Sequence, residues 1–228
     1  INNAGGALSV ANMAVTGPSF SNAGGTLDVS NSFSAQVGQL DNTGGTLNAG
    51  SLNIATTGDL INVDGTLTSA TDATLTVGGQ ADNTRGTISA TGALTANVAG
   101  AINNTAGTLA TNQPLTLTGQ SLNNSQGTIQ SAGGNVQLGI GQQLLDTDGH
   151  IASGANLTIQ TGSLAGTKGS LQSTGDLNVT AAQGLSATGT NVAGGNATLR
   201  GAFVDLSDSQ TGAANIAITA TPRGGTTT

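Results

Sequence analysis

The sequence has no cysteine, tryptophan or tyrosine, only three phenylalanines and one histidine, and no glutamate among its eleven acidic residues. Without cysteine there are no disulfides, and with a single histidine no zinc site of the usual kind can be assembled. Charged residues make up 7% of the chain, against about a quarter in ordinary soluble domains. Lys168 is the only lysine, so the charged residues that favour helices are almost missing. We therefore expect little or no α-helix.

Scarcity of positive charge excludes further classes of protein. The formal net charge is −7, and the four basic residues, Arg85, Lys168, Arg200 and Arg223, lie far apart, so we expect no nucleic-acid partner. No apolar run is long enough to span a bilayer, so we expect no membrane insertion. No signal peptide begins at Ile1, which favours a piece of a longer chain, and we expect this fragment to be monomeric. Hydrophobic residues amount to 36%, and their regular placement argues against a disordered chain.

What the chain does contain is one motif repeated nine times, of the form Asn-x-x-Gly-Thr-Leu. Well-preserved copies begin at Asn42, Asn62 and Asn104. The last glycines of the nine copies are Gly6, Gly25, Gly45, Gly65, Gly86, Gly107, Gly127, Gly149 and Gly169. They are 19 to 22 residues apart, and a fixed period of this length is typical of a solenoid protein.

Apolar residues recur at three fixed places in each period. One series, from Ile1 to Leu164, lies five residues before each glycine, and a second, from Leu8 to Leu171, lies two residues after it. The third is an alternating pair such as Leu52 and Ile54, and alternation predicts strands with one buried face. The intervening asparagines and glycines predict turns in which these residues take positive φ. The sequence thus predicts an all-β fold, a parallel β-helix of about eleven coils with three short strands per coil.

We assign residues 1–220 to a single β-helix, with regular coils over 1–171 and variant coils over 172–220. Beyond Leu171 a strand still recurs about every twenty residues, ending with Ile216 and Ile218, but the turn glycine near Thr190 is interpreted as lost. Residues 221–228 have no apolar anchor and predict a disordered tail.

The recurring asparagine has two interpretations. Stacked amides can hydrogen-bond from coil to coil and so satisfy buried polar groups, or the row can bind a ligand. We favour the ladder, because the asparagine recurs in seven successive coils and always precedes the turn glycine.

The best candidate for an active site is the group Asp146, Asp148 and His150, which would share one face of an extended strand. Two carboxylates and a histidine could act as general acid and base or hold a metal. However, Asp146 stands at the asparagine position of the repeat and Gly149 at its glycine position, so we favour a drifted copy of the structural motif. We therefore assign no catalytic, cofactor-binding or metal-binding residue, and expect no cofactor and no enzyme.

The nine motifs, each followed by a strand such as Ala93–Ala96, resemble the filamentous haemagglutinin repeat from Ile1 to about Thr180. This repeat belongs to the large exoproteins of two-partner secretion systems, among them filamentous haemagglutinin adhesins and CdiA-type effectors of contact-dependent growth inhibition. The resemblance implies a right-handed parallel β-helix, secretion through a dedicated outer-membrane partner, and display as a filament at the bacterial cell surface. A secretion domain or a toxin domain is not recognisable here.

Three functions remain open at this point. The first is a structural filament segment that presents an adhesive or toxic region to target cells. The second is a directly adhesive surface that binds a carbohydrate or a receptor on a host or bacterial cell, although only three aromatic side chains are present to stack on sugars. A polysaccharide-degrading enzyme, suggested by fold analogy alone, is a distant third.

Overall fold

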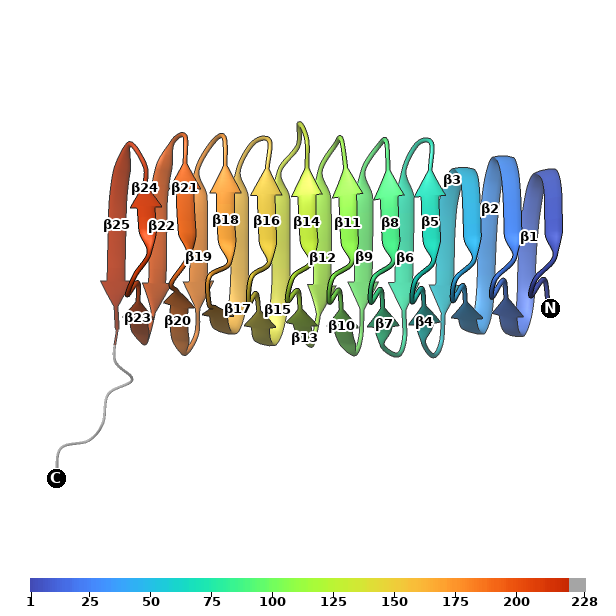
Figure 1. The fold of residues 1–228 in the computed structure, drawn as a ribbon, viewed down its shortest axis with the longest axis horizontal. Coiled ribbons are helices and arrows are strands. Elements are labelled where there is room, and N and C mark those ends of the chain that lie inside the picture. The colour runs from blue at the N-terminus through green and yellow to red at the C-terminus, as the bar shows by residue number, and fades with distance from the viewer. Residues whose placement is uncertain (222–228) are drawn as a thin grey trace, which may run out of the picture.

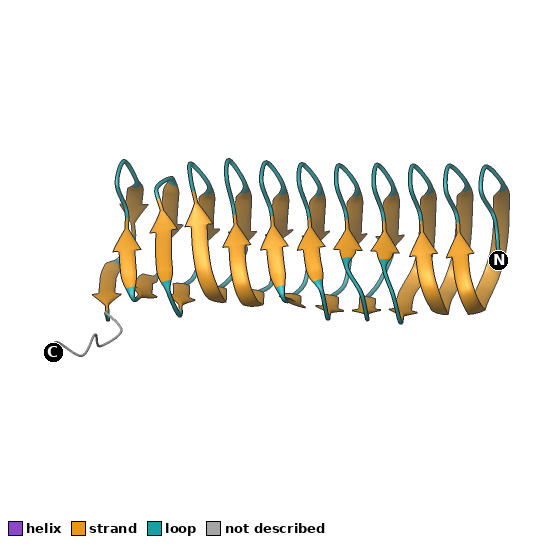
Figure 2. Cartoon of the chain, turned by 90° about the horizontal axis from the view of Figure 1, so that it is seen from below, coloured by secondary structure: helices purple, strands orange, loops and turns teal. Residues whose placement is uncertain are grey.

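In a computed structural model, residues 1–221 are described, and they form 25 β-strands and no helix. The strands wind into a rod whose first and last coils lie at opposite ends (Figure 1). Seen from below, the coils are stacked side by side and joined by short loops (Figure 2). Every strand pairing is parallel and joins one coil to the next, so the predicted all-β parallel β-helix is confirmed.

Each coil contributes strands to three faces. The first face, which follows the repeated glycine, contains β5 (Thr66–Ser69), β8 (Thr87–Ala90), β11 (Thr108–Thr111), β14 (Thr128–Ser131), β16 (His150–Ser153), β18 (Ser170–Ser173), β21 (Thr190–Ala193) and β24 (Gln210–Gly212). The second contains β6 (Ala73–Val77), β9 (Leu94–Val98), β12 (Leu115–Gly119), β19 (Leu177–Ala181), β22 (Asn196–Gly201) and β25 (Asn215–Ala220). The third contains β4 (Leu60–Ile61), β7 (Ala81–Asp82), β10 (Ala101–Asn103), β13 (Ser121–Asn123), β20 (Gly184–Ala187) and β23 (Phe203–Asp205).

Five strands differ from the expected three short strands, because they run on around a corner. Two of them, β1 (Ala7–Ser21) and β2 (Thr26–Asp41), pass through all three faces. The others, β3 (Thr46–Thr56), β15 (Val136–Leu145) and β17 (Leu157–Gly166), each cover two faces. Irregular register at Val10–Asn12 and Val29–Ser32 bends β1 and β2, so a β-bulge does there what a turn does in other coils.

The core is a stack of equivalent apolar side chains. Leu67, Ile88 and Leu109 pair in register through β5, β8 and β11, and all three are buried. Along β6 every second residue points inward, as the alternating pattern predicts. The exceptions lie in the first and last coils, where Ile1 and Ile218 are exposed, because an end coil has a neighbour on one side only.

The turn before the first face corrects one expectation. Positive φ falls neither on the asparagine nor on the repeated glycine but on the residue directly before that glycine, which is Gly44 in an early coil and Ala106 in a later one. The repeated glycine is required by space instead: a Cβ at Gly107 would lie 2.1 Å from the backbone oxygen of Asn83 in the preceding coil. No side chain fits there, which explains why this glycine is kept when its neighbour is not.

The later coils continue the same stack. The prediction that the turn glycine near Thr190 is lost was wrong. Gly189, the residue directly before Thr190, occupies the repeated-glycine position and stacks on Gly169 of the preceding coil. What changes is the buried position two residues later, where Asn191 replaces the leucine of the preceding coil, Leu171. The tail expected at 221–228 lies, beyond residue 221, outside the described residues.

Candidate functional site

A row of buried asparagines runs along one corner of the rod. In each coil the Nδ2 atom donates a hydrogen bond to the Oδ1 atom of the asparagine in the next coil, at 2.7 to 2.8 Å. The members are Asn3, Asn22, Asn42, Asn62, Asn83, Asn104 and Asn124. From Asn22 onward the same Nδ2 also donates to the carbonyl oxygen of the repeated glycine in its own coil. The predicted asparagine ladder is therefore confirmed, and its amides are occupied by one another.

Asp146 is the last rung of this ladder. Its Oδ1 accepts a 2.7 Å hydrogen bond from Asn124 Nδ2, and its side chain is fully buried. Its Oδ2 has no hydrogen-bond partner among the described residues. Burial raises the pKa of this carboxyl from 3.8 to about 7, against the opposing effect of the hydrogen bond from Asn124. In the next coil Gly166 holds the asparagine position, so no side chain continues the row.

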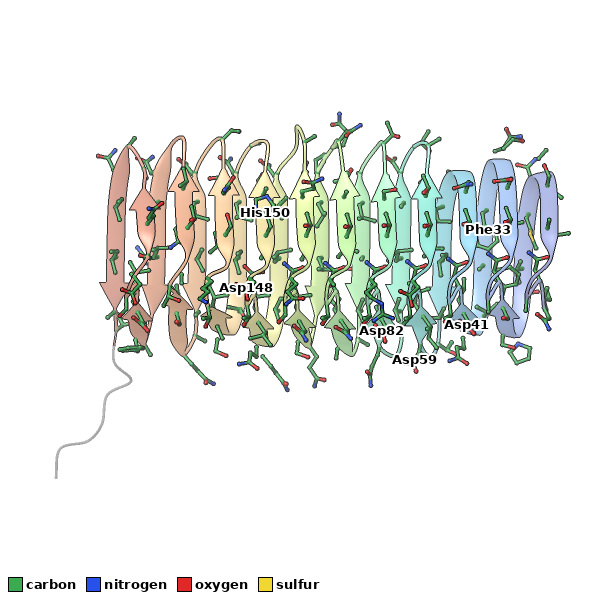
Figure 3. The ribbon with its side chains drawn as sticks, viewed as in Figure 1. Phe33, Asp41, Asp59, Asp82, Asp148 and His150 are labelled. Carbon is green, nitrogen blue, oxygen red and sulfur yellow. The ribbon has the colours of Figure 1, made fainter. Side chains whose placement is uncertain are left out.

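The other two members of the acidic group do not join Asp146. The chain from Asp146 to Gly149 is a turn, not an extended strand, and Asp148 has a left-handed backbone with φ of 52°. Asp148 is exposed at this turn, while His150 lies on the outer side of β16 (Figure 3). The described residues show no hydrogen bond or ion pair among the three. The face they would share in an extended strand does not exist, so the geometry needed for a general acid and base is missing.

Other carboxylates accept hydrogen bonds from the backbone and do not converge on a shared site. Asp41, Asp59 and Asp82 lie along the lower edge of the rod (Figure 3). The first and third accept hydrogen bonds from the backbone and hydroxyl of a threonine two residues later, and Asp59 accepts one from the backbone of Gln80 in the next coil. Within residues 1–221 no group of three or more potential ligands is placed to hold a metal.

A second polar row was not predicted from the sequence. At the corner before the second face, the side-chain Oδ1 of one coil accepts a hydrogen bond from the backbone nitrogen of the equivalent residue in the next. Asn135, Asn156 and Asp176 form this outer row and are bonded to successive coils at 2.8 to 3.1 Å. A signal was available, because an Asn or Asp directly precedes the apolar anchor in each of these coils.

The surface carries several open hollows of similar size, and one of about 620 Å³ lies at the corner between the second and third faces. It crosses several coils, and none of its lining residues is charged. Its polar side chains are Thr118, Gln120, Gln160 and Thr161. No helix that could cross a membrane occurs in the described part of the chain.

The family model of the haemagglutinin repeat matches residues 2–63, 59–139 and 132–221, and so covers nearly all of the rod. The chain belongs to the haemagglutinin repeat family. The coils described above are the units of this repeat, and the expected membership of the filamentous haemagglutinin and CdiA-type exoproteins is confirmed.

One similar protein supports the same placement. Over 49 residues the chain is 59% identical to the tRNA nuclease CdiA-2 of Burkholderia pseudomallei (strain 1026b). The aligned segment is 21% of this chain but only 2% of that protein. No solved structure matches the chain. Repeat family, β-helix and this similarity together fit a filamentous segment of a large exoprotein.

Proposed function

We propose that this segment is a spacer in a secreted exoprotein, without catalytic activity, which holds an adhesive or toxic region away from the exporting bacterium. The observation that supports this most strongly is the uninterrupted parallel pairing of each coil with the next from β1 to β25. Because each coil contacts only its neighbours, coils can be added or lost without redesign of the rest. Each coil adds about 4.8 Å of reach. Secretion through an outer-membrane partner and a location at the cell surface are part of the proposal.

Absence of convergent chemistry also favours a spacer. A catalytic or binding site needs different residue types brought together at one place. Here the side chains of Asp146, Asp148 and His150 diverge, and the asparagine row is occupied by its own hydrogen bonds. The tRNA nuclease activity in the name of CdiA-2 belongs to that protein, of which the aligned segment is a very small part.

The second candidate is a directly adhesive surface, and the hollow near Gln120 and Gln160 is the observation that favours it. An uncharged trough with amide and hydroxyl groups suits a neutral, hydroxyl-rich ligand such as a glycan. No aromatic residue lines it, which weakens this alternative.

A matched pair of deletions in the full-length parent protein separates the two functions. Deletion of residues 46–86 joins Gly45 to Thr87 and removes two coils away from the hollow, in register. Deletion of residues 108–149 joins Gly107 to His150 and removes two coils through the centre of the hollow. We expect both variants to be displayed and to engage target cells equally. If only the second loses engagement while still reaching the surface, the hollow binds the target and the spacer proposal fails.

A further inference from the structure

The ladder requires a hydrogen-bond donor at the position of Asp146 Oδ2. In six preceding rungs the Nδ2 atom at this position donates to the carbonyl oxygen of the repeated glycine, for example from Asn104 to Gly107 at 3.2 Å. A carboxylate has no proton to donate. Asp146 therefore differs from the other rungs in the one atom that must donate.

The positions of the two oxygens show that Asp146 occupies the rung as an asparagine does. Its Oδ1 accepts from Asn124, as each asparagine Oδ1 accepts from the rung before it. Its Oδ2 lies 2.6 Å from where a Cβ of Gly169 would be, and Asn104 Nδ2 lies 2.9 Å from the equivalent point at Gly127. By this equivalence Oδ2 takes the place from which Asn104 Nδ2 donates to the carbonyl of Gly107, and the matching carbonyl in this coil is that of Gly149. An ionised carboxyl would set two oxygens against each other there without water.

Charged neighbours do not compensate for this arrangement. The titratable groups nearest in sequence on the packed turns are Asp148 and His150 in the same coil and Lys168 in the next, and the preceding turn, residues 124–127, has none. Asp148 and Lys168 are exposed, and His150 lies on the outer side of β16. None of the three bonds to Asp146 among the described residues. Beyond the ladder, Gly166 offers no side chain, so no partner comes from the next coil either.

We propose that Asp146 is a proton-dependent joint in the rod. When protonated, its hydroxyl donates to the carbonyl of Gly149 and the ladder is complete. When ionised, Oδ1 still accepts from Asn124, but Oδ2 no longer donates to Gly149, so the turn 146–149 is held less firmly in shape and its backbone bonds to the next turn, 166–169, open more readily. The rod is then stiffest in acid and has one preferred opening point at neutral and alkaline pH.

Amide hydrogen exchange on the whole chain tests this proposal, with wild type and Asp146→Asn compared at the same pH from 5 to 8. Asparagine supplies the missing donor at every pH. The reporters are the amides of Asp146 and Asp148, which donate to Ala165 and Thr167 in the next coil. We expect the opening constant of wild type relative to Asp146→Asn to rise by about tenfold per pH unit until the carboxyl is ionised. The amide of Asn62, several coils away, is the internal control and should show no such rise.

Two outcomes overturn the proposal. The first is a ratio between the two proteins that does not change with pH. The second is a pH-dependent ratio that disappears in His150→Gln, which would assign the titration to the histidine. Should Asp146→Asn fail to fold, the titration midpoint of the Asp146 carboxyl, measured by carbon-13 NMR in the wild-type protein, tests the proposal instead. A midpoint near neutral pH supports the joint, and one below pH 5 contradicts it.

Discussion

At the scale of single residues, two neighbours in the turn have opposite requirements. Ala106 has a left-handed backbone with φ of 53°, which costs an L-residue about 1 kcal/mol relative to glycine. Gly107 has ordinary φ, but a Cβ there would meet the backbone of the preceding coil. The two glycine positions of the repeat are thus selected by different forces, one by dihedral angle and one by space.

These requirements predict opposite changes from two adjacent substitutions. Ala106→Gly should raise the free energy of unfolding by about 0.5 kcal/mol, because relief of strain exceeds the added entropy of the unfolded chain. Gly107→Ala should lower it by about 3 kcal/mol or more, because two coils must move apart. Urea denaturation of both variants measures the pair. Changes of the same sign would contradict this account of the turn.

The pKa of Asp146 predicts how stability depends on pH. The carboxyl has a pKa of about 7 when folded and about 3.8 when unfolded, so the folded state binds the proton more tightly. Its contribution is complete below pH 4, falls as the pH rises, and is lost above pH 7. The full change is on the order of 4 kcal/mol. Asp64 acts in the opposite direction, because the hydrogen bonds from Arg85 lower its pKa: its contribution is present above pH 3.8 and is lost as the pH falls below that.

Urea unfolding at pH 5 and pH 8 tests this dependence. Wild type should be less stable at pH 8, and Asp146→Asn should change much less between the two values. Equal pH dependence in both proteins would show that another group titrates.

At the scale of the structural elements, the two polar rows should contribute very differently. Asn104 is fully buried, and the two hydrogens of its Nδ2 are shared among acceptors on Gly107, Asn124 and Thr128. Asn156 also joins its coil to the next, but it is exposed and water can replace it. Asn104→Ala should cost about 3 kcal/mol, and the matched control Asn156→Ala less than about 1 kcal/mol. Thermal or urea unfolding measures both variants. Similar losses in the free energy of unfolding would show that burial does not determine how much each side chain stabilises the stack.

The positions of most strands and of their inward-facing residues can be predicted from the sequence, because they depend on which side chains are buried. Leu109 and its equivalents could be placed inside from their spacing alone, and the asparagine ladder from its repetition. The curvature of β1 and β2 could not be predicted, because bulges depend on local pairing rather than on hydrophobic pattern. Asp146 was correctly recognised as a copy of the asparagine, but its missing donor becomes evident only when the neighbouring carbonyl is located.

At the scale of the whole molecule, the rod is a sum of nearly equal coils. Eleven coils at about 4.8 Å each give a length of roughly 50 Å. Since no coil contacts any but its neighbours, removing coils should change the length and leave the cross-section unchanged. Dependence of length on coil number is the physical property that a spacer needs.

The most direct test of this central claim is small-angle X-ray scattering of the chain with and without residues 46–86. The largest dimension should fall by roughly 10 Å while the cross-sectional radius of gyration stays the same. An unchanged length, or a shorter particle with a wider cross-section, would contradict the stack of independent coils on which the proposed spacer depends.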